Sequence, residues 1–105
     1  MAQDNPAYPI GTASVSYFDP NNGNSLNIHV FSTDGYTVTE RYAVSNQPGG
    51  WMTGEFNQPG GAVSATSWVD GAGAHIRVYC TDEDTTTEWC FDPGTMWTKG
   101  SYTNI

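Results

Sequence analysis

Basic residues are scarce in this sequence, which contains three Lys or Arg against eleven Asp or Glu and has a formal net charge of -8. A charge of this sign repels phosphate backbones and anionic lipid headgroups. No apolar run in the chain reaches the length that is needed to cross a bilayer. We therefore expect neither nucleic acid nor membrane insertion for this protein.

Cysteine and histidine are also scarce, with two of each in the chain. They do not follow the ligand spacing of a zinc site. The acidic segment DEDT at 82–85 lacks the spaced ligands and the central glycine of a calcium loop, which favours a solvated hairpin tip. We therefore expect no metal and no cofactor.

The first residues, MAQDNPAYPIG, lack the basic start and the apolar stretch of a secretory signal. We expect no classical signal peptide here. The compartment stays unknown, with a cytoplasmic location and export without a leader both open.

Aromatic residues make up 13% of the chain, as much as all charged residues together. Together with many Gly, Thr, Ser and Asn residues, this composition is typical of a soluble all-β protein. The length of 105 residues suits a single domain over 1–105. Few charges and many aromatics favour a polar, uncharged ligand such as a sugar.

The chain contains an internal repeat. NIHVFSTDGYTVTERY at 27–42 aligns without a gap with HIRVYCTDEDTTTEWC at 75–90, at an offset of 48 residues. The likeness continues on both sides, so we place the first repeat at about 12–61 and the second at about 62–105. Alternating residues predict four strands in each repeat, at 13–18, 25–31, 37–43, 51–56, 62–68, 74–81, 85–91 and 96–102.

Each repeat contains a hairpin signal. The dipeptide at 34–35 is Asp-Gly, a two-residue type I′ turn signal, and the dipeptide at 82–83 stands at the equivalent place in the second repeat. Counting outward from these turns gives one geometry in both repeats. It predicts that His29 lies opposite Glu40 and that Arg77 lies opposite Glu88.

The same register decides between a disulfide and free thiols. It places Cys80 opposite Thr85 and Cys90 opposite His75, so the two sulfur atoms point to opposite faces of the sheet. A disulfide needs the two Cα atoms within about 7 Å and converging Cβ vectors. We therefore predict two free, half-buried cysteines.

A four-stranded unit that recurs every 40 to 50 residues is typical of a β-propeller blade, and propellers close with about four to eight blades. Two blades cannot close a ring, and alone they would expose edge strands. We therefore expect several chains to assemble, most simply as a homotrimer that completes a six-bladed propeller.

A polar pair recurs in both repeats, and a tryptophan, Trp51 or Trp97, recurs a short distance downstream of it. The plain interpretation of Arg77 and Glu88 is a surface salt bridge. Repetition of the pair with an aromatic residue instead indicates a repeated pocket. A guanidinium and a carboxylate can together satisfy neighbouring sugar hydroxyls, while an aromatic face packs against the C–H face of the sugar.

Two other function classes compete with sugar binding. The tryptophans, above all Trp68 and Trp89, suit a propeller core, and a structural or protein-binding propeller scaffold without sugar binding is the alternative. An enzyme would need two carboxylates facing a scissile bond, or a nucleophile held by His and Asp. Glu40 and Glu88 belong to separate repeats, and each faces a basic partner, so we expect no catalysis.

The runs HIRVYCTDEDTTTEWCFD, TGEFNQPGG and SATSWV resemble the fucose-binding lectins of the Aleuria aurantia lectin family, above all its short two-blade Ralstonia-type bacterial members. The resemblance is specific over about 66–103, fair over 28–61 and weak before Leu26. It implies a six-bladed propeller made by trimerisation. It also implies multivalent, non-catalytic binding of L-fucose and fucosylated glycans between adjacent blades.

The resemblance assigns one sugar site to the polar pair Arg77 and Glu88. Its aromatic partner would be Trp51 of an adjacent chain, with further contacts near Glu55. Ala43 stands where the family has a second Trp, so one aromatic wall is missing.

A second, weaker sugar site would combine His29 and Glu40 with Phe91 and Trp97 of the same chain, with further contacts near Ser101. His29 stands where the family has Arg, and a neutral imidazole cannot reproduce the guanidinium fork. We therefore predict one good fucose site and one weak or lost site per chain.

Overall fold

The computed structural model describes residues 8–105, which form eight strands and no helix, so this part of the chain has no helix that could cross a membrane. The strands begin and end within three residues of the expected positions, except that the last one is shorter than expected. Their bounds are β1 (Gly11–Asp19), β2 (Ser25–Thr33), β3 (Thr37–Val44), β4 (Met52–Pro59), β5 (Ala62–Asp70), β6 (Gly73–Asp82), β7 (Thr85–Phe91) and β8 (Thr98–Lys99).

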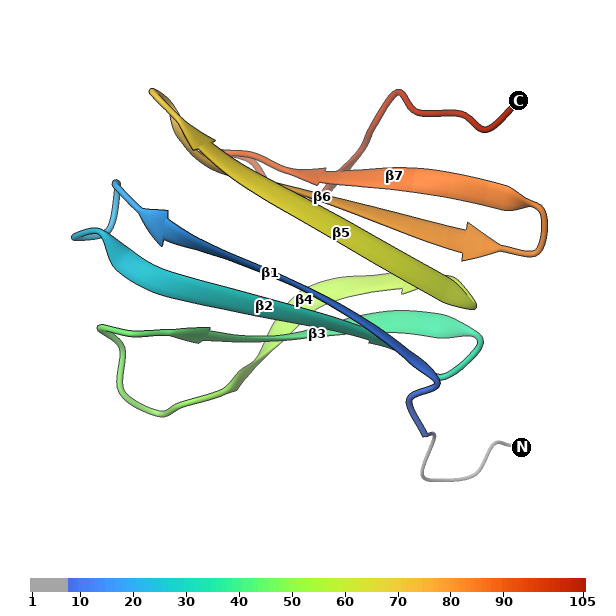
Figure 1. The fold of residues 1–105 in the computed structure, drawn as a ribbon, viewed down its shortest axis with the longest axis horizontal. Helices are drawn as coiled ribbons and strands as arrows, with labels where there is room; N and C mark the ends of the chain where they lie inside the picture. Colours follow the sequence, from blue (N-terminus) through green and yellow to red (C-terminus); the bar gives the residue numbers. More distant parts are fainter. Residues whose placement is uncertain (1–7) are drawn as a thin grey trace.

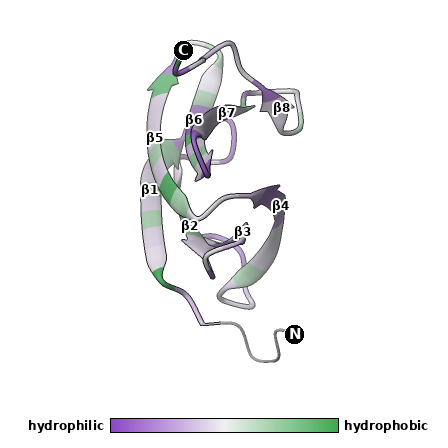
Figure 2. Cartoon of the chain, turned by 90° about the vertical axis from the view of Figure 1, so that its right-hand side faces the viewer, coloured by the Kyte–Doolittle hydropathy of each residue, from purple (hydrophilic) through white to green (hydrophobic). Residues whose placement is uncertain are grey.

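The eight strands form two four-stranded antiparallel sheets, in the orders β1-β2-β3-β4 and β5-β6-β7-β8 (Figure 1). Each sheet is a meander of consecutive strands, which is the arrangement of a propeller blade. β1 and β5 run side by side, and the Ser67 hydroxyl donates to the Ser16 carbonyl oxygen across them at 3.1 Å. From these two strands the sheets extend separately to β4 and β8, as Figure 2 shows.

The hydrophobic core lies between the two sheets. Phe31 of β2 is fully buried. Its ring makes edge-on contacts with Phe56 of the same sheet and with Trp97 of the second repeat, at centroid distances of 5.4 and 5.9 Å. Trp89 packs partly buried against this core as expected, but Trp68 is 41% exposed, so the core interpretation is wrong for Trp68. The buried core residues are Val15, Phe31, Val38, Phe56, Ile76, Val78 and Cys80.

Both hairpins turn one residue later than the sequence predicts. Asp34 pairs with Thr37, which leaves Gly35, at a φ of 103°, inside the turn. The Asp34 carboxylate accepts from the backbone N–H groups of Tyr36 and Thr37 at 2.9 and 3.0 Å, and this side-chain turn favours Asp before the loop rather than within it. In the second hairpin Asp82 pairs with Thr85 in the same way.

This shift changes the partner of each glutamate. Glu40 lies opposite Phe31 rather than His29, and Glu88 lies opposite Tyr79 rather than Arg77, so the predicted pairs are wrong. The predicted and the observed partner of each glutamate are two residues apart on the same strand, and side chains in a strand alternate between faces with a period of two. Each glutamate therefore still shares a face with its expected basic partner, as a diagonal neighbour.

The cysteine partners also move by two residues, to Thr87 for Cys80 and Arg77 for Cys90. The two cysteines still point to opposite faces, and both are free, as predicted. Both are buried rather than half-buried. Burial raises the pKa of the Cys80 thiol to about 11, so this thiol is unreactive at neutral pH.

Candidate functional site

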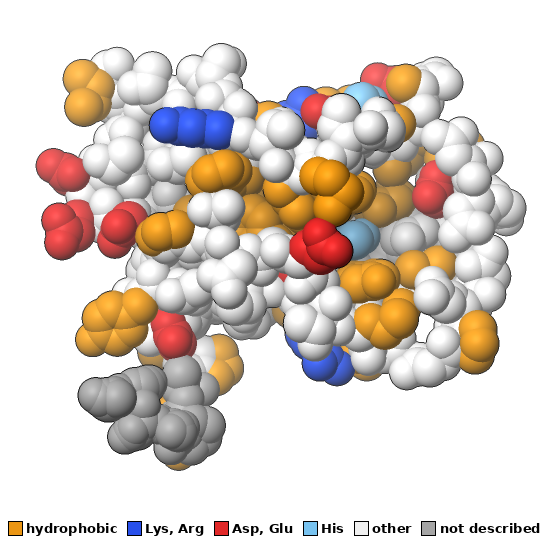
Figure 3. Space-filling view, turned by 180° about the vertical axis from the view of Figure 1, so that it is seen from behind, with side chains coloured by type: hydrophobic (Ala, Val, Ile, Leu, Met, Phe, Trp, Pro, Cys, Tyr) orange, Lys and Arg blue, Asp and Glu red, His pale blue; other side chains and the backbone are white. Residues whose placement is uncertain are grey.

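A hollow of about 390 Å³ opens between the two sheets. Figure 3 shows the face opposite to that of Figure 1, with a histidine and an acidic side chain next to each other among hydrophobic side chains. Strands β1 to β4 supply most of the lining, and the segment that follows β7 closes the other side. The lining residues are Tyr17, Asp19, Asn27, His29, Glu40, Tyr42, Thr53, Gly54, Glu55, Phe91, Met96 and Trp97.

Glu40 lies at an irregularity of β3, where the register against β4 shifts between Thr39 and Arg41. Such a bulge re-aims a side chain, and the Glu40 side chain points inward, with Glu40 only 5% exposed. Its carboxylate accepts from the backbone N–H of Phe56 at 3.4 Å and bonds the His29 ring. The buried charge is therefore satisfied within the chain.

His29 uses both ring nitrogens within the protein. Nδ1 lies 2.6 Å from the Glu40 carboxylate, and Nε2 lies 3.0 Å from the Tyr17 hydroxyl. Because a carboxylate can only accept, Nδ1 carries a proton. The imidazole also stacks between Tyr17 and Tyr42, with ring centroids 5.7 and 5.6 Å away. His29 is therefore fixed in position and has no free donor for a ligand.

Trp97 forms the aromatic wall of the hollow together with Phe91, at a centroid distance of 5.1 Å. The same indole meets Phe56 at 4.7 Å, so it belongs both to the core and to the hollow. The structure thus brings His29, Glu40, Phe91 and Trp97 together in one chain.

Two residues are grouped differently from the expectation. Glu55 lines the hollow of His29, whereas Ser101 lies beside Glu88 of the second sheet. Within one chain, each of the two residues thus lies beside the glutamate of its own repeat, and a contact of Glu55 with Arg77 of an adjacent chain stays a prediction. The reason is that β4 and the segment after β8 each fold back onto the glutamate of their own sheet.

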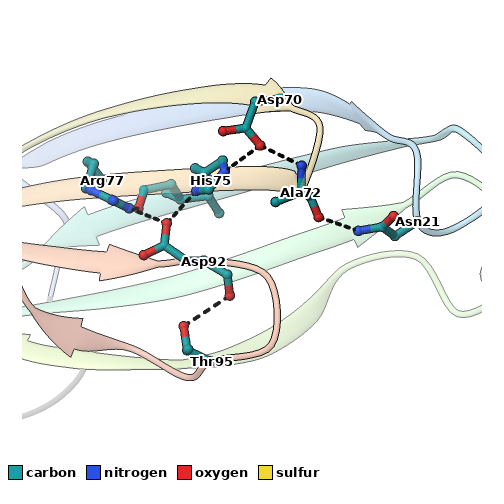
Figure 4. Close-up of polar contacts among 8 residues, drawn as sticks. Asn21, Asp70, Ala72, His75, Arg77, Asp92 and Thr95 are labelled. Atoms are coloured by element: carbon teal, nitrogen blue, oxygen red, sulfur yellow. Dashed lines mark hydrogen bonds and ion pairs between the residues drawn. The ribbon is translucent and has the colours of Figure 1, made fainter.

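Arg77 is held by an acid that the sequence analysis did not select. Its Nη1 donates to Asp92 at 2.8 Å (Figure 4). Its guanidinium lies 4.9 Å from the centre of the Trp68 ring. Burial opposes the charge, but the Asp92 carboxylate raises the pKa of Arg77. Within the described residues Nε and Nη2 make no hydrogen bond, so these donors remain for a ligand.

His75 joins the same cluster. Its Nδ1 lies 2.6 Å from Asp92 and its Nε2 lies 2.9 Å from Asp70 (Figure 4). The imidazole ring stacks on Trp68. Both carboxylates raise the pKa of His75, and the hydrogen bond with Asp92 has the larger effect. The Arg77 guanidinium in turn lowers the pKa of Asp92.

Glu88 does not contact Arg77 directly. It accepts from the Tyr79 hydroxyl at 2.7 Å and from the Tyr102 N–H at 3.1 Å, and the Tyr79 hydroxyl contributes most to lowering the pKa of Glu88. Trp51, 47% exposed, directly precedes β4 of the other sheet. Its predicted contact with this site requires a second chain and stays a prediction.

Sequence reasoning missed Tyr17, Tyr42, His75 and Asp92. One signal was available: a single guanidinium on a sheet needs an acid, and Asp92 follows β7 directly. Tyr17 had no such signal, since its contact with His29 depends on the pairing of β1 with β2.

The chain was compared with known proteins. A family model described as fungal fucose-specific lectin matches residues 3–104. Among solved structures, a fucose lectin from Kordia zhangzhouensis in complex with methyl-fucoside is similar, with 29% sequence identity and a TM-score of 0.70. The similarity covers 95% of this chain and 71% of that chain. No curated protein matches.

Proposed function

We propose that this chain, which belongs to the fungal fucose-specific lectin family, is a non-catalytic lectin for L-fucose and fucosylated glycans. The observation that carries this proposal is the family match over nearly the whole chain. The similar bacterial lectin with methyl-fucoside supports it. No cofactor is needed, because hydrogen bonds and aromatic packing suffice to hold a neutral sugar.

The stronger sugar site is proposed around Arg77 and Glu88. The free Nε and Nη2 donors of Arg77 and the ionised Glu88 carboxylate offer charge-assisted hydrogen bonds to sugar hydroxyls. Asp92 fixes the guanidinium without occupying these donors. Trp51 of an adjacent chain would cover the C–H face of the sugar. Ala43 has no aromatic ring to form the second aromatic wall of this site.

The hollow of His29 is proposed as the weaker fucose site. Tyr17 and Glu40 already use both nitrogens of the imidazole. His29 therefore cannot supply the two hydrogen bonds that a guanidinium donates to a sugar. Phe91 and Trp97 still offer an aromatic wall.

The absence of catalysis is proposed from the state of the carboxylates. A glycosidase needs a carboxyl group that stays protonated near neutral pH to act as an acid. The hydrogen bond from Tyr79 lowers the pKa of Glu88, so this carboxylate stays ionised and serves as an acceptor.

The test is the change Arg77→Ala, with isothermal titration of methyl-fucoside as the measurement. Loss of charge-assisted bonds of about 1.5–3 kcal/mol each predicts at least tenfold weaker binding. Lys99→Ala removes the same charge from an exposed side chain of β8 and is the matched control, expected to bind like the wild type.

Unchanged affinity of Arg77→Ala would contradict the proposed site. A glycan array tests the function itself: fucosylated hits that free L-fucose inhibits support the lectin. An array without any hits would favour the structural or protein-binding propeller scaffold.

A further inference from the structure

The two sheets differ in how their acids are paired. In the second sheet His75 bonds Asp70, and Arg77 bonds Asp92. The strand pairings place Asp19 at the position of Asp70 and Asn27 at the position of His75, because β1–β2 and β5–β6 align with the repeat. Asn27 carries no charge. The acid at the end of β1 therefore lacks the basic partner that its counterpart has.

The hollow between the sheets has an excess of negative charge. Its lining includes Asp19, Glu40 and Glu55 but no Lys or Arg. Its one basic side chain, His29, is bonded to Glu40. Among residues 8–105 no ion pair involves Asp19 or Glu55. The Asp19 carboxylate accepts only from the backbone N–H of Asn21, at 2.9 Å, among the bonds of these residues. Two carboxylates at this hollow thus have no basic partner within residues 8–105.

The electrostatic potential inside the hollow is negative as well. Burial and the charges of Asp19 and Glu40 raise the pKa of Tyr17 to about 12. A neutral ligand gains nothing from such a field, and an anion is repelled. A ligand with a positive group is attracted in proportion to its charge.

The remaining walls suit an organic cation rather than a bare metal ion. Tyr42, Phe91 and Trp97 line the hollow, and aromatic faces attract ammonium groups as well as sugar C–H faces. Among residues 8–105 no group of three His, Cys, Asp or Glu side chains is arranged to hold a metal ion. A lining that combines aromatic rings with two carboxylates without a basic partner therefore fits a ring that carries an amine.

We propose that the hollow of His29 binds a monosaccharide with a free, positively charged amine in preference to fucose. The ammonium group lies between the carboxylates of Asp19 and Glu55, and the sugar ring packs against Trp97. The choice of a sugar as the carrier of the amine rests on the proposed lectin function. The preference for a cation rests on the lining of the hollow alone.

The experiment titrates D-glucosamine and N-acetyl-D-glucosamine into the full chain at pH 6, followed by NMR shifts and calorimetry. The two sugars differ in the charge at one nitrogen. We expect glucosamine to bind at least about tenfold more tightly, because a charge-assisted hydrogen bond is lost in the amide. This difference should shrink at high salt, since Asp19 and Glu55 are not buried.

Asp19→Asn and Glu55→Gln should each remove most of the preference for glucosamine. Glu83→Gln, which removes one acid from the exposed β6–β7 turn, is the charge-matched control and should keep the preference. Equal binding of the two sugars, no binding of glucosamine, or full binding by both acid variants would overturn the proposal.

Methyl-fucoside titrated into the same samples separates the two proposals. Arg77→Ala should bind fucose at least about tenfold more weakly but keep its affinity for glucosamine, because Arg77 does not line the hollow. A protein that binds glucosamine but no fucose would refute the assignment of fucose as the ligand and leave the amine site standing. The reverse result would refute only the amine site.

Discussion

Arg77 and His29 occupy equivalent positions in the two repeats, and their surroundings explain why they cannot replace each other. Arg77 is anchored through one nitrogen by Asp92 and keeps further donors free. His29 has two nitrogens, and both are used by Tyr17 and Glu40. A single difference thus replaces a guanidinium that keeps free donors with an imidazole whose two nitrogens are both used within the chain.

The cluster of His75 with Asp70 and Asp92 makes a residue-scale prediction for pH. The pKa of His75 is raised in the folded chain, so its contribution to stability is full below about pH 6.5 and is lost as the pH rises through the folded pKa. The pKa values of Asp70 and Asp92 are lowered, so their contribution is present above about pH 4 and is lost on acidification. We expect the highest melting temperature between these limits.

Calorimetric melting from pH 3 to pH 9 measures this profile. The variant His75→Gln should flatten the decline above pH 6.5, while the decline on the acid side remains. A variant whose melting temperature falls as steeply with rising pH as that of the wild type would show that another group causes the decline.

At the scale of the strands, glycine makes room for the glutamate of each repeat, buried Glu40 and partly exposed Glu88. A Cβ at Gly54 of β4 would overlap the Glu40 carboxylate, and a Cβ at Gly100 would overlap the Glu88 carboxylate and the Cys90 sulfur. The two repeats therefore solve the same packing problem in the same way. Burying a carboxylate against a neighbouring strand requires that strand to have no side chain there.

The change Gly54→Ala should lower the free energy of unfolding by about 1–3 kcal/mol, because overpacking displaces a carboxylate that cannot move to solvent. Urea unfolding measures the loss. Gly71→Ala is the control, since a Cβ there has no atom within 4 Å and should cost little. A Gly54→Ala protein as stable as this control would contradict the tight packing at Glu40.

Strand positions could be predicted from the sequence, but the partners across the hairpins could not. The alternation of residues is local, so it indicated the strands and the side chains that share a face. The position of the turn depended on whether Asp34 lies inside the loop or before it. The bonds from Asp34 to Tyr36 and Thr37 decided this and moved each pairing by two residues.

At the scale of the molecule, the two sheets form a flat body of 43 × 36 × 18 Å with exposed aromatic side chains. Trp51 and Tyr102 are 47% and 46% exposed. Single exposed apolar residues are common on a monomer, but two blades of a propeller also leave their outer faces uncovered. Assembly into a ring would cover these faces.

We predict a homotrimer in solution, because three two-blade chains are the simplest way to reach six blades. Light scattering coupled to gel filtration should give three times the 11.4 kDa mass of one chain. A mass of one chain at micromolar concentration would exclude the ring and, with it, the contact of Trp51 with Arg77 of a neighbour. Avidity for fucosylated surfaces would then be lost as well.

The sequence by itself determined that the chain is all-β, repeats once and presents an Arg or His with a Glu on one face of each repeat, because strand alternation is a local property. Only the tertiary structure decided that Asp92 holds Arg77, that Tyr17 binds His29 and that Glu55 joins the hollow of His29. These contacts depend on how the strands pair and how the two sheets pack, and hydrogen-bond partners far apart in sequence are not encoded by any local pattern.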